Sequence, residues 1–234
     1  MSTIINLRGT NASGKSTAVR SVMDYYGVAE ELVHPVNGKI IGYILNNNWA
    51  VLGRYETDCG GCDTLPGFDA IRKLVHQCLP MIAGGVLFEG VLWSTVFKST
   101  AELIAELPQH KFILATLDTP VETCVARLRH RNEAKAARER KPVKYSNDAG
   151  LRSKHDGIYR THLKLKQAGF DARWVDHKNA PAQLLTWIDG RLCPSCGKPG
   201  FNDADNTPDE AFFHQIVGNN HNNDYISCES DHAD

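Results

Sequence analysis

The chain has 234 residues, 42% of them hydrophobic and 23% charged, and its formal net charge at pH 7 is −1. This composition excludes a disordered chain, a collagen and a coiled coil, and no apolar stretch approaches the ~18 residues of a membrane span. The N-terminus also lacks the basic and apolar regions of a secretion signal. We therefore expect a cytoplasmic protein without a membrane partner.

Apolar patterning predicts strands that alternate with helices. A short run from Thr3 to Leu7 indicates a buried strand, and a helical pattern from Ser16 to Tyr26 ends at a capping glycine, Gly27. The later elements are a hairpin at 39–45 and 49–55, a helix at 68–82, a strand at 86–88, a helix at 95–107, a strand at 112–117, helices from 121 and at 151–168, a strand at 172–175 and a helix at 181–188. This order predicts a doubly wound α/β fold with a mainly parallel sheet over residues 1–190, followed by a small tail, 191–234.

A glycine-rich loop lies between the first strand and the first helix. It matches the pattern G-x-x-x-x-G-K-[ST] at every fixed position, which predicts a P-loop that binds the phosphates of a nucleotide. The lysine of such a loop reaches the β and γ oxygens of the nucleotide, and the hydroxyl that follows ligates Mg²⁺. The expected nucleotide-binding residues are Gly9, Thr10, Asn11, Ala12, Ser13, Gly14, Lys15, Ser16 and Thr17.

Three acidic residues are candidates for further catalytic roles. Glu89 ends the strand at 86–88, where an acid can contact Mg²⁺ or its waters, or accept the proton of an attacking hydroxyl. Asp58 and Asp63 lie in the loop after the hairpin, where a carboxylate could bind the acceptor or act as general base. Glu89 and Asp63 rank equally as the base and above Asp58. Arg54, in the same region, is a candidate ligand for an acceptor or DNA phosphate, or else part of a surface ion pair.

The helix that begins near Val121 is expected to become a lid over residues 127–148. Its apolar face stops at Leu128, and a basic face follows on which Arg127, Arg131 and Lys135 are spaced four residues apart, with Arg138 nearby. Arginine side chains of this kind stabilise the charge that develops during phosphoryl transfer, although a solvated charged helix is the alternative. We assign Arg127 and Arg131 to catalysis, and Lys135 and Arg138 to substrate binding.

The charge of the chain is strongly segregated. Residues 127–166 hold thirteen Lys and Arg against four acidic residues, a net charge of +9, whereas residues 191–234 hold two basic and eight acidic residues, a net charge of −6. A nearly neutral total therefore does not exclude a polyanionic partner. The basic segment favours nucleic acid, with an affinity that falls as salt rises.

The seven cysteines suggest a structural metal site. Cys78 and Cys124 fall on the inner faces of helices and are expected to be core residues. The C-P-x-C-G-K run in the tail is typical of zinc ribbons, and a small acidic tail needs such a metal to stay folded. The expected zinc ligands are Cys193, Cys196, Cys228 and His214, with His221 or His232 as alternatives for the fourth ligand. Alternatively, Cys59 and Cys62 join the first two in a four-cysteine site, or belong to an acceptor loop whose glycines allow close backbone approach.

Several of these motifs together resemble the bacteriophage 5-hydroxymethyluracil DNA kinases. The resemblance spans about residues 3–176 and rests on the P-loop with Arg8 before it, Leu52-Gly53-Arg54-Tyr55, Cys59-Gly60-Gly61-Cys62-Asp63, Phe88-Glu89-Gly90 and Asp118-Thr119-Pro120. It implies a P-loop kinase of the host cytoplasm that uses ATP to phosphorylate the 5-hydroxymethyl group of 5-hydroxymethyluracil in double-stranded phage DNA, a step in thymine hypermodification.

A base stacked inside a duplex cannot reach the P-loop, so the target nucleotide must flip out. Tyr55, Trp49 and Trp93 are candidate stacking surfaces for it. Two other functions remain open: a deoxynucleoside monophosphate kinase that acts on free nucleotides, and a P-loop ATP-binding switch or partner-binding module with no phosphoryl acceptor.

Overall fold

The computed structural model describes residues 1–56, 60–145, 147–189, 201–202, 212–215 and 225–227. It divides into two compact units, Met1–His177 and Lys178–Asp234. In the part of the chain described, no helix combines the length and the apolar character needed to cross a membrane.

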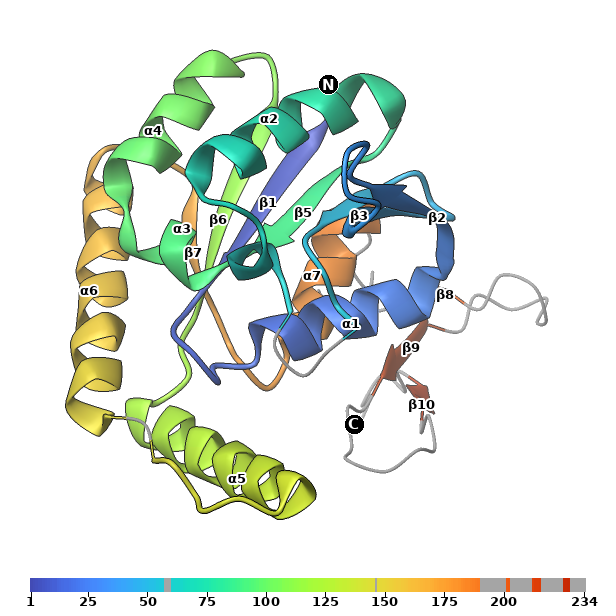
Figure 1. The fold of residues 1–234 in the computed structure, drawn as a ribbon. Coiled ribbons are helices and arrows are strands. Elements are labelled where there is room, and N and C mark those ends of the chain that lie inside the picture. The colour runs from blue at the N-terminus through green and yellow to red at the C-terminus, as the bar shows by residue number, and fades with distance from the viewer. Residues whose placement is uncertain (57–59, 146, 190–200, 203–211, 216–224, 228–234) are drawn as a thin grey trace, which may run out of the picture. The chain divides into compact units, whose positions relative to one another are not determined.

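A seven-stranded mixed sheet forms the centre of the first unit, with strand order β2-β3-β4-β5-β1-β6-β7 (Figure 1). The strands from β4 to β7 in this order run parallel to their neighbours, whereas β2, β3 and β4 pair antiparallel. The bounds are β1 Thr3–Arg8, β2 Val28–Val33, β3 Ile40–Leu45, β4 Ala50–Leu52, β5 Gly85–Glu89, β6 Lys111–Leu117 and β7 Ala172–Val175. This is an α/β fold, and the prediction of a mainly parallel sheet is confirmed.

Helices cover the sheet and bury its apolar side chains. One core cluster joins Ile4 and Phe88 of the central strands to Trp93 and Leu103 of the helices that follow β5. Strand residues alternate between the two faces, so Ile5 lies on the opposite face, and it is also fully buried. The helices of this unit are α1 Lys15–Tyr26, α2 Phe68–Cys78, α3 Val91–Thr95, α4 Phe97–Glu106, α5 Val121–Glu139 and α6 Asp148–Gln167.

Three elements differ from the sequence prediction. The helix predicted at 68–82 ends at Cys78 and continues as a 3₁₀ turn, where Pro80 lacks the N–H that an α-helix needs. The helix predicted at 95–107 is α4, which begins at Phe97 because Val96 is extended, and the short helix α3 before it was not predicted. Strand β2 was not predicted, since almost all of its residues are exposed and its two glutamates break the apolar pattern.

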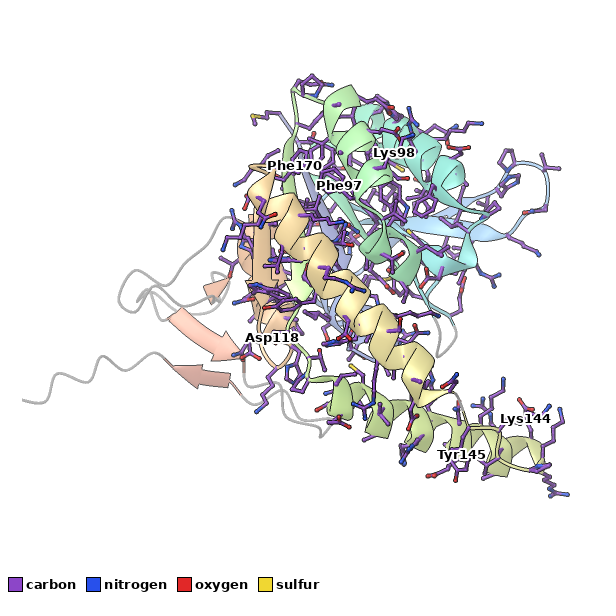
Figure 2. All side chains as sticks on the ribbon, turned by 90° about the vertical axis from the view of Figure 1, so that its left-hand side faces the viewer. Phe97, Lys98, Asp118, Lys144, Tyr145 and Phe170 are labelled. Carbon is purple, nitrogen blue, oxygen red and sulfur yellow. The ribbon has the colours of Figure 1, made fainter. Side chains whose placement is uncertain are left out.

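Helix α5 is attached to the rest of the unit at its N-terminal half. Cys124, Val125 and Leu128 form a cluster with Leu151 of α6. Beyond Leu128, the helix buries only Ala136. The C-terminal half of α5 extends away from the sheet, and Figure 2 shows Lys144 and Tyr145 in the connection at its far end. This arrangement agrees with a helix that leaves the core after Leu128.

The second unit contains α7, Ala180–Asp189, and a three-stranded antiparallel sheet of order β10-β9-β8. Its strands are β8 Phe201–Asn202, β9 Phe212–Gln215 and β10 Tyr225–Ser227. Three of the predicted zinc ligands, Cys193, Cys196 and Cys228, lie outside the described residues. The fourth, His214, lies in β9, and its side chain is outside the described part. The zinc site therefore stays a prediction.

Candidate active site

The P-loop connects the C-terminal end of β1 to the first turn of α1. Lys15 folds back over the loop, and its Nζ donates a hydrogen bond to the carbonyl of Thr10 at 2.9 Å. Gly9 must be glycine, because its φ is +155° and an added Cβ would lie 2.6 Å from Oγ of Ser13. The loop therefore wraps tightly in front of a helix N-terminus, where unpaired N–H groups attract phosphate.

Glu89, at the end of β5, meets the residues that follow the loop. Oγ of Ser16 donates to Oε1 of Glu89 at 2.6 Å, and Nζ of Lys15 lies 3.9 Å from Oε2. Only 1% of Glu89 is exposed. Burial raises the pKa of the Glu89 carboxyl, against the opposing effects of Lys15 and the Ser16 hydrogen bond. A hydroxyl and a carboxylate side by side are the oxygen ligands that suit Mg²⁺, so these residues fit the predicted metal site.

The glycines of the loop after the hairpin lie directly against Glu89. Gly61 has a φ of +85°, and a Cβ there would lie 2.2 Å from Oε1 of Glu89. A Cβ at Gly53 would in turn lie 2.3 Å from the carbonyl carbon of Gly61. On this side, the backbone of Gly61 rather than a side chain therefore covers the carboxylate. This is the close backbone approach that the paired glycines suggested.

Cys62 follows these glycines and is a buried free thiol with Sγ 3.5 Å from the carbonyl oxygen of Leu52. Burial, and then the charge of Glu89, raise the pKa of its thiol well above the usual value. A protonated core thiol does not favour the alternative four-cysteine metal site, and Cys59 lies outside the described residues. Cys78 and Cys124 are buried free thiols as well, as predicted.

Asp63 caps helix α3. Its Oδ2 accepts a hydrogen bond from the backbone N–H of Val91 at 2.9 Å, and its Oδ1 accepts one from Leu92 at 3.2 Å. Both oxygens therefore bind the first turn of the helix that follows Glu89. The structure thus gives Asp63 a positioning role beside the site, and its use as general base stays a prediction. Asp58 lies outside the described residues.

Arg127 lies over the P-loop. Its Nη1 donates to the carbonyl of Ser13 at 3.4 Å, and Oγ1 of Thr119 donates to the same oxygen at 2.7 Å. Ala12 of the loop packs against the apolar cluster between α5 and α6. The base of the predicted lid is therefore fixed to the phosphate-binding loop.

The other basic residues of the predicted lid lie farther along α5. Arg131 is one turn beyond Arg127, and among the described residues it forms no ion pair. Nζ of Lys135 lies 3.9 Å from Glu139 of the same helix, and Arg138 lies in the last turn. The structure brings Arg127 to the P-loop but does not bring Lys135 or Arg138 there.

Residues at the end of the hairpin are held by local contacts. Nε of Arg54 lies 3.5 Å from the carboxylate of Glu56, so the ion-pair alternative is the one observed. Tyr55 is buried, as are Trp49 and Trp93, and none of these three rings offers an exposed face to a base. The backbone carbonyl of Tyr55 accepts a hydrogen bond from Arg20 of α1.

Sequence reasoning assigned no role to the side chain of Arg8, which is fully buried at the last position of β1. Its guanidinium donates to Oδ1 of Asn6 at 2.8 Å, Oγ1 of Thr100 at 3.2 Å and the carbonyl of Ser94 at 2.9 Å. No carboxylate among the described residues pairs with it, and burial lowers the pKa of Arg8 to about 9. The sequence feature that could have indicated a buried role for Arg8 is its position in an apolar strand, directly before Gly9. It places an unneutralised positive charge beside the P-loop.

Comparisons with known proteins match this chain to one family and to several relatives. A family model described as 5-hmdU DNA kinase matches residues 1–163. The 5-hmdU DNA kinase of Pseudomonas phage PaMx11 is 36% identical over 136 residues, which cover 56% of this chain and 70% of the relative. That of Pseudomonas phage M6 is 30% identical over 193 residues, or 79% of this chain and 97% of the relative. A designed protein with a P-loop NTPase fold aligns over 81% of this chain and 92% of its own, with 11% identity and a TM-score of 0.38, too low to carry an argument.

Proposed function

The chain belongs to the 5-hmdU DNA kinase family, and from this premise we propose that it transfers the γ-phosphoryl group of ATP to the 5-hydroxymethyl group of 5-hydroxymethyluracil in phage DNA. One observation carries the proposal. The P-loop, Ser16 and Glu89 form a single contact network within the span that the family model matches. The product is a phosphomonoester on the base, which is a step in thymine hypermodification.

Residues around the P-loop supply the charge that phosphoryl transfer requires. Lys15 and the backbone N–H groups of the loop hold the β and γ phosphates, and Arg127 stabilises negative charge from the lid side. Ser16 and Glu89 would hold Mg²⁺, which neutralises charge on the nucleotide oxygens when it is bound. The uncompensated charge of Arg8 adds to the positive potential at this end of β1.

The acceptor hydroxyl must lose its proton as its oxygen bonds to the γ-phosphorus and the bond to ADP breaks. Glu89 is the better candidate for the proton acceptor, because both oxygens of Asp63 already accept hydrogen bonds from α3. Burial raises the pKa of the Glu89 carboxyl, which makes it a stronger base than an exposed carboxylate. Asp63 then acts by holding α3 in place.

Duplex DNA would bind along the basic residues of α5 and α6, and the modified base would leave the stack to reach the site. Lys135 and Arg138 lie on this stretch, where they suit DNA phosphates, while Arg131, one turn beyond Arg127, stays a candidate for catalysis. Affinity for DNA would fall as salt rises, because phosphate contacts release bound cations.

The test is to incubate the protein with γ-labelled ATP and, in parallel, a duplex containing 5-hydroxymethyluracil, the unmodified duplex, and free hydroxymethyldeoxyuridine monophosphate. Label in the modified duplex alone supports the proposal. Label in the free nucleotide instead would identify a nucleotide kinase, and phosphate release that needs no acceptor would identify a switch. Lys15→Ala should abolish transfer, whereas Lys73→Ala, on the exposed face of α2, should not.

The zinc site of residues 191–234 rests on the sequence pattern alone. Metal analysis of freshly purified protein tests it: one zinc per chain is expected, and its absence rejects the site.

A further inference from the structure

A separate cavity of about 180 Å³ opens beside the P-loop. Its walls come from the loop, from the residues after β6, from α6 and from β7. Asp118, labelled in Figure 2, is one of the lining residues, and Leu117 and Ile158 supply apolar wall. The cavity is mostly apolar and is open to solvent on one side.

Two buried hydroxyls at the P-loop end of this cavity have no hydrogen-bond partner among the residues that the structure describes. Oγ1 of Thr10 and Oγ of Ser13 both line the cavity, and each residue is only 2% exposed. A buried hydroxyl without a partner costs free energy that a bound polar group recovers. The loop thus presents two vacant hydrogen-bonding groups to any ligand that enters.

Aromatic side chains form the opposite wall. Tyr159 is 49% exposed and Trp174 is 37% exposed, although both are large apolar rings. Their ring centroids lie 5.1 Å apart, with 31° between the ring planes. The ring of His162 also packs on Trp174, with 3.8 Å between the ring centroids, and this contact holds the indole in place. Half-exposed rings of this kind are the stacking surfaces that proteins use for unpaired bases.

The volume selects the size of the ring. An apolar cavity of about 150 Å³ holds one benzene molecule, so 180 Å³ fits a single six-membered ring and is small for a fused purine. A pyrimidine has that size, and the polar groups on its edge can pair with the two hydroxyls. Lys154, Arg160 and Lys164 are exposed on α6 and complement the phosphates on either side of such a base.

We propose that this cavity binds the pyrimidine ring of the flipped target nucleotide, stacked on Tyr159 and Trp174 with its polar edge toward Thr10 and Ser13. This inference rests on the proposed function and deepens it. A base held here lies against Thr10 of the loop that binds the nucleotide phosphates. The carbonyl of Thr10 accepts a hydrogen bond from Nζ of Lys15, so the base and the phosphate-binding lysine contact the same loop residue. Adenine of ATP is the competing occupant, and the test separates the two.

The test compares Tyr159→Leu and Trp174→Leu with the wild type and with Tyr25→Leu, a control at an exposed tyrosine of α1. In Tyr159→Leu, the KM for the duplex containing 5-hydroxymethyluracil should rise by about tenfold, as expected for the loss of one stacking contact. The KM for ATP and the acceptor-free hydrolysis of ATP should not change. Trp174→Leu should act in the same direction, and melting temperatures verify that each variant folds.

Three results would overturn the inference. If both variants keep the wild-type KM for modified DNA while the wild type is active, the cavity does not hold the base and the proposed function stands. If the KM for ATP rises instead, the cavity is an adenine site. If the wild type phosphorylates no modified duplex, the proposed function fails and this inference fails with it.

Discussion

Replacing Glu89 by glutamine separates catalysis from stability at this site. Glutamine keeps an oxygen that can accept the hydrogen bond of Ser16, now made at 2.6 Å, but removes the negative charge. At 3.9 Å and an effective dielectric constant of about 20, the attraction to Lys15 is about 4 kcal/mol. Burial of an ion costs several kcal/mol, so the two effects nearly cancel. The direction of the pKa shift of Glu89 then decides whether its charge stabilises or destabilises the folded protein.

Burial raises the pKa of Glu89, which means that folding disfavours the charged form of this side chain relative to the unfolded chain even with Lys15 beside it. Glu89→Gln should therefore leave the free energy of unfolding of the metal-free protein unchanged or higher. Activity should show the opposite effect, because the variant lacks a carboxylate for Mg²⁺ and for the acceptor proton. We expect kcat to fall by about 100-fold or more.

The assay pairs thermal unfolding in EDTA with single-turnover phosphorylation of the modified duplex. Glu102→Gln is the matched control, because it removes an exposed carboxylate that pairs with Lys98 on α4 (Figure 2). Wild-type activity in Glu89→Gln would refute the catalytic assignment. A fall in the melting temperature of Glu89→Gln by more than about 4 °C, which corresponds to roughly 1 kcal/mol of unfolding free energy, would show that the charge of Glu89 stabilises the fold. That result would refute the argument that its burial outweighs its attraction to Lys15.

Three further predictions concern the surroundings of the site. Gly61→Ala should reduce kcat as Glu89→Gln does, because the added Cβ would meet the Glu89 carboxylate. The same change should lower the free energy of unfolding, measured with urea, by about 1–3 kcal/mol. Normal activity of this variant would contradict the prediction. Asp63→Ala should destabilise the protein by about 1 kcal/mol, because it removes the cap of α3. Asp63→Asn keeps one acceptor oxygen and should keep most of the activity. If Asp63→Asn instead loses as much activity as Glu89→Gln, Asp63 is the base. Burial and the charge of Arg8 lower the pKa of His162 to about 4. From pH 6.5 down to pH 4, the unfolded chain therefore binds a proton at this histidine that the folded protein does not bind. The free energy of unfolding falls as pH falls through this range. His162→Gln should remove about 2 kcal/mol of that loss between pH 7 and pH 4.5, and an unchanged pH profile would count against it.

The phosphate end of the site could be predicted because its motif encodes backbone geometry. The glycines, Lys15 and Ser16 fix a loop whose shape hardly depends on the rest of the chain, and an acid at the end of β5 must lie near it in a parallel sheet. The Ser16–Glu89 contact confirms that these two residues are brought together. The alternation of strands and helices fixed the order of the elements in the same way.

The acceptor side could not be predicted to the same degree, because it depends on tertiary contacts. The cap that Asp63 makes on α3 follows from the bridge between Arg54 and Gly61, which sets the register of the loop. Tyr55 is buried because the hairpin packs on α1, a contact that no local pattern shows. Tyr159 and Trp174 lie on two consecutive elements, and the pairing of β7 with β6 and the path of α6 decide that their rings meet.

Mass analysis of the reacted DNA tests the central claim most directly. A duplex containing 5-hydroxymethyluracil is incubated with ATP and Mg²⁺, digested to nucleosides and examined for the mass of one added phosphoryl group. We predict that this mass appears on 5-hydroxymethyldeoxyuridine with the wild-type protein, is absent with Lys15→Ala, and is absent from every other nucleoside. Unmodified 5-hydroxymethyldeoxyuridine after reaction with folded, ATP-binding protein would contradict the account.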